Sequence, residues 1–127
     1  MGGAKRWVLV VEDDQVVRDA LVGLLGDEDD LAAVGTGSGG DALRVLGALR
    51  VHGLVVDLAM PGTNGLDLID RVRAHEETRG VPVVVVTALA PGAIARRAAA
   101  TVYPVVGKPF DAAELLATVR GALDRSG

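Results

Sequence analysis

Five side chains with complementary chemistry stand at the ends of short apolar runs in this sequence. Three are acids, one carries a hydroxyl and one an amine: Glu12, Asp13, Asp57, Thr87 and Lys108. Each stands at or directly after the end of a run rich in valine. If these runs are parallel strands, their carboxyl ends share one edge of a sheet, where open α/β sheets place their ligands. The spacing therefore predicts that the five side chains meet in one site.

Three carboxylates in one site need a cation between them. Two like charges about 4 Å apart repel by roughly 4 kcal/mol at an effective dielectric constant of about 20. Oxygen ligands without His or Cys favour a hard ion, Mg²⁺ first, and this ion also suits phosphoryl transfer. A carboxylate can act as the nucleophile and carry an aspartyl-phosphate. In that chemistry Lys108 supplies a positive charge for one phosphoryl oxygen, and Thr87 supplies a hydroxyl donor for another.

The elements that position these residues are expected to be five strand–helix units in a single domain over residues 1–127. Half of the chain is apolar, but it has only one Trp, one Tyr and one Phe, so valine, leucine and alanine must form the core. Valine-rich runs without alternation suit strands that are buried on both faces, which predicts a doubly wound parallel α/β sheet. The crossovers between strands should be right-handed.

The expected elements have the following bounds. Strands are expected at 7–11, 31–34, 54–57 and 81–86, and around 105–106. Helices are expected at 14–25, from Thr36 or Ser38 to Leu49, at 65–74, at 91–100 and at 111–123. Asp14, Ser38 or Thr36, and Asp111 are the expected N-caps, because their short side chains can accept from the first free N–H groups of a helix.

Composition excludes several classes of function. The chain has no cysteine, so a disulfide framework or a thiolate metal site is excluded. A net charge of −4 gives no basic surface for direct binding of nucleic acid. The longest apolar stretch, 81–95, contains Pro82 and Pro91 and is too short to span a membrane. We therefore expect a cytoplasmic protein without a direct membrane contact.

The chain resembles the response-regulator receiver domains of two-component signalling over nearly all of its length. The resemblance is carried by four motifs, at 8–14, 55–65, 86–88 and 108–110. The most specific is Asp-x-x-Met-Pro-Gly-x-Asn-Gly from Asp57 to Gly65, with an acid pair before it and Lys-Pro after it. The resemblance implies a flavodoxin-like sheet with the strand order 2-1-3-4-5 and five helices.

The resemblance also implies the roles of the acids. Asp57 would accept a phosphoryl group from a histidine kinase or a phosphotransfer protein. Asp13, Asp57 and the backbone carbonyl of Ala59 would hold Mg²⁺, and Glu12 would act through water. The chain would then be a signalling domain that catalyses only its own phosphorylation and dephosphorylation.

The phosphoryl-binding and switch residues follow from the same resemblance. Thr87, Ala88 and Lys108 would bind the phosphoryl group and respond to it, and the peptide bond before Pro109 would be cis. The sequence departs from the family at Val105, where receivers usually carry an aromatic switch residue three positions before the site lysine.

This departure shapes the expected output surface, formed by the fourth helix, the fifth strand and the fifth helix. Without a ring that moves in and out, the switch should be a shift of the fourth helix and the loop before it. Five residues are expected to line the surface: Arg96, Arg97, Tyr103, Val105 and Arg120. The downstream protein target is unknown, and a homodimer that forms on phosphorylation is left open.

Parts of the sequence suggest three other functions, and other residues argue against each of them. The segment Gly35–Gly40 satisfies the dinucleotide fingerprint G-x-G-x-x-G, but it follows the second strand, and the acids after the first strand would repel phosphate. A Mg²⁺-dependent aspartate phosphatase would need an acid two residues past the nucleophile, where Ala59 stands. The complete set of acids, threonine and lysine argues against an interaction module that works without phosphorylation.

Overall fold

The computed structural model describes residues 4–60, 63–88 and 103–126. Its centre is a five-stranded sheet in which every neighbouring pair of strands is parallel. The strands are β1 (Arg6–Val11), β2 (Leu31–Thr36), β3 (Gly53–Val56), β6 (Val83–Thr87) and β7 (Val105–Gly107). Their order, β2-β1-β3-β6-β7, confirms the predicted order 2-1-3-4-5.

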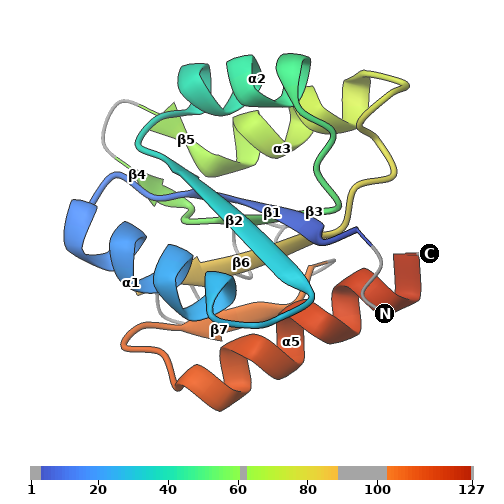
Figure 1. Cartoon of the computed structure of the whole chain (residues 1–127). Helices are drawn as coiled ribbons and strands as arrows, with labels where there is room; N and C mark the ends of the chain where they lie inside the picture. Colours follow the sequence, from blue (N-terminus) through green and yellow to red (C-terminus); the bar gives the residue numbers. More distant parts are fainter. Residues whose placement is uncertain (1–3, 61–62, 89–102, 127) are drawn as a thin grey trace.

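Helices cover both faces of this sheet (Figure 1). The helices of the described residues are α1 (Gln15–Gly26), α2 (Gly39–Ala48), α3 (Gly65–Ala74) and α5 (Ala112–Ser126). Figure 1 shows α2 and α3 on one face and α1 and α5 on the other. The predicted fourth helix, 91–100, lies outside the described residues, so the structure shows four of the five expected helices.

The N-caps form as the sequence predicted. The Asp14 side chain accepts from the N–H groups of Val16 and Val17, at 2.9 and 3.2 Å. Ser38 caps α2, and Asp111 accepts from the third N–H group after it at the start of α5. The alternative cap, Thr36, ends β2 instead, and its hydroxyl donates to the Val10 carbonyl.

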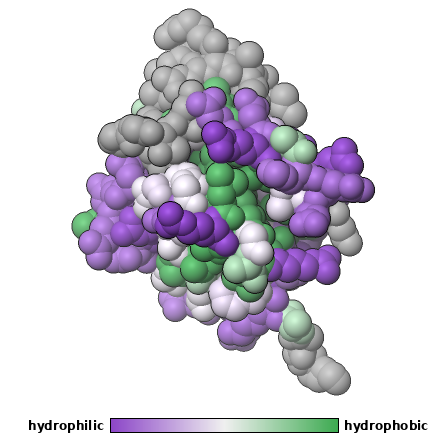
Figure 2. All heavy atoms as spheres, turned by 90° about the horizontal axis from the view of Figure 1, so that it is seen from above, coloured by the Kyte–Doolittle hydropathy of each residue, from purple (hydrophilic) through white to green (hydrophobic). Residues whose placement is uncertain are grey.

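The core lies in two layers because the strands alternate their side chains between the two faces of the sheet. Leu9 and Val11 of β1 pack under α2 and α3, whereas Val8 and Val10 pack under α1 and α5. Seen from above, the α2 and α3 side shows apolar surface bordered by hydrophilic side chains (Figure 2). Each fully buried Val or Leu contributes roughly 1.5–3 kcal/mol.

The chain after β3 forms a short hairpin that the sequence did not predict. Its strands, β4 (Ala59–Met60) and β5 (Thr63–Asn64), pair antiparallel, with Ala59 opposite Asn64. Gly65 then begins α3 in close contact with the end of β3: a Cβ atom there would lie 2.7 Å from the Asp57 carbonyl oxygen. Glycine therefore allows α3 to start directly against the residue that carries the expected chemistry.

Ion pairs join the first strand to the last helix. Arg6 in β1 donates to Asp124 in α5 at 3.0 Å and lies 3.7 Å from Asp30. The start of β1 and the end of α5 lie at the amino ends of the strands, opposite the edge where the strands finish (Figure 1). Among the described residues, no helix is both long enough and apolar enough to cross a membrane.

Candidate functional site

The five residues of the predicted site stand at the carboxyl edge of the sheet. Glu12 and Asp13 follow β1, Asp57 follows β3, Thr87 ends β6 and Lys108 follows β7. The parallel register aligns these ends, since the last residues of β1 and β3 are partners and the last residues of β6 and β7 are partners. The sheet thus brings together residues from four separate parts of the chain.

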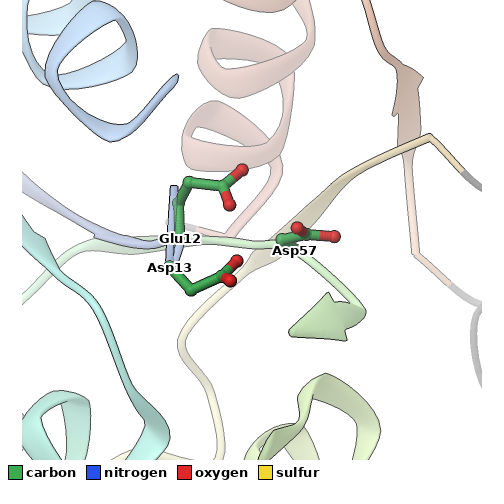
Figure 3. Close-up of side chains that lie close together, drawn as sticks. All are labelled: Glu12, Asp13 and Asp57. Atoms are coloured by element: carbon green, nitrogen blue, oxygen red, sulfur yellow. The ribbon is translucent and has the colours of Figure 1, made fainter. Parts of the chain in front are cut away.

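The three acids gather around one small volume. One oxygen from each of Glu12, Asp13 and Asp57 lies within 4.8 Å of the others, and Figure 3 shows the three side chains converging. Glu12 and Asp57 are buried, whereas Asp13 is exposed. Three carboxylate oxygens at this spacing, partly open to solvent, form a donor set that can hold a hard divalent cation.

Lys108 inserts its amine between two of these acids. Its Nζ atom donates to Asp57 Oδ2 at 3.0 Å and to Glu12 Oε1. Burial by itself lowers the pKa of Lys108, but the hydrogen bonds to both carboxylates outweigh it and raise the pKa above its ordinary value. The amine therefore remains protonated and contributes one full positive charge to the site.

Several hydrogen bonds fix the position of Glu12. Its backbone N–H donates to the Thr36 carbonyl at 3.0 Å, and its own carbonyl accepts from Arg18 Nη1 at 2.9 Å. The second carboxylate oxygen accepts from the Asp14 N–H at 3.2 Å. Burial raises the pKa of the Glu12 carboxyl, although the hydrogen bonds from Lys108 and Asp14 oppose this rise.

The remaining predicted site residues lie around this centre. Thr87 is buried, and its carbonyl accepts from the Lys108 N–H at 2.9 Å. Ala88 follows it and is exposed. The Lys108–Pro109 peptide bond is cis, in agreement with the expectation. Ala59 begins β4, two residues after Asp57, and the role of its carbonyl as a metal ligand stays a prediction.

Comparison with known proteins assigns the family. Residues 8–120 match the family described as the response regulator receiver domain. The chain belongs to this receiver family. It is 34% identical over 119 residues to the chemotaxis protein CheY of Pseudomonas aeruginosa, covering 93% of this chain and 96% of CheY. It thus belongs to two-component signalling, as the motifs implied.

A second group of relatives is longer. The DNA-binding response regulator MtrA of Mycolicibacterium smegmatis is 35% identical over 130 residues, which cover 99% of this receiver but 54% of MtrA. The receiver therefore spans about half the length of these curated relatives. A putative response regulator from Chloroflexus aurantiacus is 29% identical with a TM-score of 0.86, covering 95% of this chain and 99% of that chain.

The residues expected on the output surface differ in exposure, and two of them fall in the part of the chain that the structure does not describe. Arg96 and Arg97 lie outside the described residues. Val105 in β7 is partly exposed, at 38%. Tyr103 is half-buried against the core layer under α2 and α3, and the guanidinium of Arg73 in α3 lies 5.5 Å from its ring centroid. The ring is thus held between a cation and the core.

Arg120 departs from the expected output surface of this receiver. Its guanidinium donates to both carboxylate oxygens of Asp30, at 2.7 and 2.9 Å, and to Glu28 at 2.7 Å. These acids stand in the loop between α1 and β2, and β2 is at the opposite edge of the sheet from β7. A side chain at this position of α5 could point toward either edge of the sheet. The hydrogen bonds with Glu28 and Asp30 hold the Arg120 guanidinium on the side away from β7.

The glycine-rich segment Gly35–Gly40 has a packing role in the receiver. A Cβ atom at Gly35 would lie 2.9 Å from Arg18 Cγ, and one at Gly37 would lie 2.9 Å from Arg18 Nη1. The space that a dinucleotide pyrophosphate would need beside these glycines is filled by a side chain of the same protein. Arg18 also contacts the backbone of Glu12, and it was not among the site residues predicted from the sequence.

Proposed function

We propose that this receiver takes a phosphoryl group on Asp57 from a histidine kinase or a phosphotransfer protein. One observation carries the proposal: the Asp57 carboxylate lies 3.0 Å from the Lys108 amine and shares a small volume with the acids Glu12 and Asp13. A nucleophilic carboxylate, a fixed positive charge and a cation-binding acid pair are the groups that phosphoryl transfer to a carboxylate requires.

The donor set fits Mg²⁺. All three side-chain ligands are carboxylates, their oxygens lie within 4.8 Å of one another, and one of the acids is exposed. Asp13, Asp57 and the Ala59 carbonyl would hold the ion, with Glu12 acting through water. When bound, Mg²⁺ supplies positive charge to the oxygens of the phosphoryl group.

The residues of the chain would share the other tasks. An oxygen of Asp57 forms the new bond to phosphorus while the bond from phosphorus to the donor breaks. The Lys108 amine, already 3.0 Å from Asp57, would neutralise one phosphoryl oxygen, and the Thr87 hydroxyl would donate to another. Ala88 follows Thr87 directly and is exposed, and it would border the phosphoryl group beside Thr87.

The signal would leave through the surface of the fourth helix, β7 and α5. Phosphorylation adds nearly two negative charges and three acceptor oxygens beside Thr87 and Lys108. Thr87 ends β6, so a movement of its side chain would carry the loop that follows into a new position. The recipient is a downstream protein, met in the cytoplasm, and a homodimer formed on phosphorylation is a second arrangement that the proposal allows.

Labelling with acetyl phosphate in the presence of Mg²⁺ tests the phosphoacceptor. Intact-mass measurement should show one added phosphoryl group on the wild-type protein and none on Asp57→Ala. Asp67→Ala, which removes an exposed acid in the first turn of α3, serves as the matched control and should label normally. Equal labelling of Asp57→Ala would overturn the assignment.

Hydrogen exchange with and without beryllofluoride, a mimic of the bound phosphoryl group, tests the output surface. Protection should change in residues 88–106 and stay constant in α1 and α2. A change confined to α1 and α2 would contradict the proposed surface.

A further inference from the structure

Arg18 holds the backbone that carries the acid pair. Its Nη1 atom donates to the Glu12 carbonyl at 2.9 Å and reaches the Asp13 carbonyl at 3.5 Å. Both carbonyls come after Val11, the last residue of β1, where the chain leaves the sheet and turns into α1. The cationic side chain of Arg18 therefore donates to backbone carbonyls of the turn between β1 and α1.

The fold places Arg18 for this task. Its N–H donates to the Asp14 carbonyl at 2.8 Å, which closes the first turn of α1. Its half-buried side chain then runs back past the end of β2, where Gly35 and Gly37 would each bring a Cβ atom to 2.9 Å from it. A side chain at either glycine would therefore crowd Arg18 in its present position.

The consequence for Glu12 is that each of its polar groups has a partner from a different element. Its N–H is bound by β2, its carbonyl by α1, and its carboxylate by Lys108 and the Asp14 N–H. Without the hydrogen bond from Arg18, the peptide plane between Glu12 and Asp13 could turn. The directions of the Glu12 and Asp13 side chains would then change with it.

We propose that Arg18 is a positioning residue that sets the orientation of the Glu12–Asp13 acid pair toward a divalent cation. It touches neither the cation nor the phosphoryl group, and it acts through the two backbone carbonyls. The inference rests on the proposed function, because it concerns the geometry of the same acids. Gly35 and Gly37 support this role, because they leave the space in which the Arg18 side chain lies.

Titration with Mg²⁺ by calorimetry measures the effect directly, without reliance on phosphorylation. Arg18→Met keeps an apolar stem but removes the guanidinium, and should weaken Mg²⁺ binding by roughly tenfold or more, as loss of outer partners does at other metal sites. Arg18→Lys keeps a donor and should recover part of the affinity. Leu24→Ala removes apolar packing from α1 and should lower stability without changing the affinity for Mg²⁺.

A second substitution disturbs the Arg18 side chain without replacing Arg18 itself. Among the described residues, a Cβ atom at Gly37 would meet only the Arg18 guanidinium within 4 Å, so the effect of Gly37→Ala on Mg²⁺ binding should be present in the wild type and absent in Arg18→Met. Gly40→Ala is the matched control, because a Cβ atom there has no neighbour within 4 Å in the part of the chain that the structure describes, and it should bind Mg²⁺ normally. If Arg18→Met fails to fold, Gly37→Ala alone still tests the proposal, because it should weaken Mg²⁺ binding whereas its control should not.

Two results would overturn the inference. One is an unchanged Mg²⁺ affinity in folded Arg18→Met and in Gly37→Ala. The other is an equal loss of affinity from Gly37→Ala with and without Arg18. A wild type that binds no Mg²⁺ and takes no label from acetyl phosphate would instead remove the proposed function, so the two failures are distinguishable.

Discussion

The amine of Lys108 lies 3.0 Å from Asp57 across 51 positions of sequence, and the same amine also binds Glu12. Lys108 therefore occupies oxygens that a divalent cation at this site would also attract. One ammonium cannot neutralise three carboxylates, so the cluster still favours a further positive charge. A divalent cation bound here would share the acids with the Lys108 amine, and each would make the other's binding less favourable.

Lys108→Met should change cation binding and phosphorylation in opposite directions. Mg²⁺ should bind several-fold more tightly, because a positive charge beside its ligands is gone. Phosphorylation by acetyl phosphate should slow by about a hundredfold, because a fixed charge for the phosphoryl oxygen is lost. Calorimetry and a labelling time course measure the two effects. Weaker Mg²⁺ binding in the variant would contradict the competition.

Gly65→Ala should destabilise the protein by about 1–3 kcal/mol, since the new methyl group must displace backbone. The added Cβ would lie 2.7 Å from the Asp57 carbonyl oxygen and 2.8 Å from Leu58 Cα. Urea unfolding measures the loss, and labelling of Asp57 should fall as well. Gly23→Ala in α1, where no described residue would lie within 4 Å of the new Cβ atom, should instead raise the free energy of unfolding by about 0.5–1 kcal/mol.

Asp30 should make stability sensitive to acid. The hydrogen bonds from Arg120 lower the pKa of Asp30 from its ordinary 3.8 to about 2. A depressed carboxyl pKa adds stability above the unfolded value and loses it as pH falls through the folded value. The melting temperature of wild type should therefore exceed that of Asp30→Asn above about pH 4, and the difference should vanish toward pH 2.

A neighbouring acid provides the control for this pH dependence. Asp29→Asn removes the same charge from the same exposed loop, and the Arg120 contacts are to Glu28 and Asp30. The difference in melting temperature between wild type and Asp29→Asn should not decrease in the same way between pH 4 and pH 2. If both variants follow the same curve, general charge rather than the Arg120 contact determines the effect.

Arg73 and Tyr103 should be energetically coupled. A double-mutant cycle of Arg73→Met and Tyr103→Leu should give a coupling of about 0.5–1 kcal/mol, as expected for a cation near the ring of an aromatic side chain that is not fully desolvated. Arg73→Met alone should cost more, because Arg73 also donates to the Arg79 and Val81 carbonyls, both at 2.6 Å. A coupling of zero would mean that the cation does not hold the ring.

The sheet and the place of the site could be predicted from the sequence because both depend on local patterns. Valine-rich runs fix which segments are strands, and the carboxyl ends of parallel strands meet at one edge whatever the connections between them. Asp57 and Lys108 therefore could be expected to approach each other before any coordinates were known. The order of the strands came from the family resemblance, because runs of valine do not specify their neighbours.

The features that escaped prediction depend on side-chain direction and on contacts between distant segments. Arg18 and Arg120 both stand on helices at positions that allow more than one direction, and their partners decide which one is taken. The hairpin of Ala59–Met60 with Thr63–Asn64 is too short to give a periodic pattern. The packing of Arg18 against Gly37 could not be predicted, because a sequence does not show which side chain lies against a glycine.

The ion pair between Arg6 and Asp124 places the two ends of the described chain beside each other. A short linker could join them, and new ends could be opened at Glu76, whose side chain is 88% exposed in the loop after α3. In such a circular permutant Lys108 would come before Glu12 along the chain, yet every strand would keep its neighbours. The order in which the motifs occur is thus a property of the gene, whereas the site itself depends only on the order of strands in the sheet.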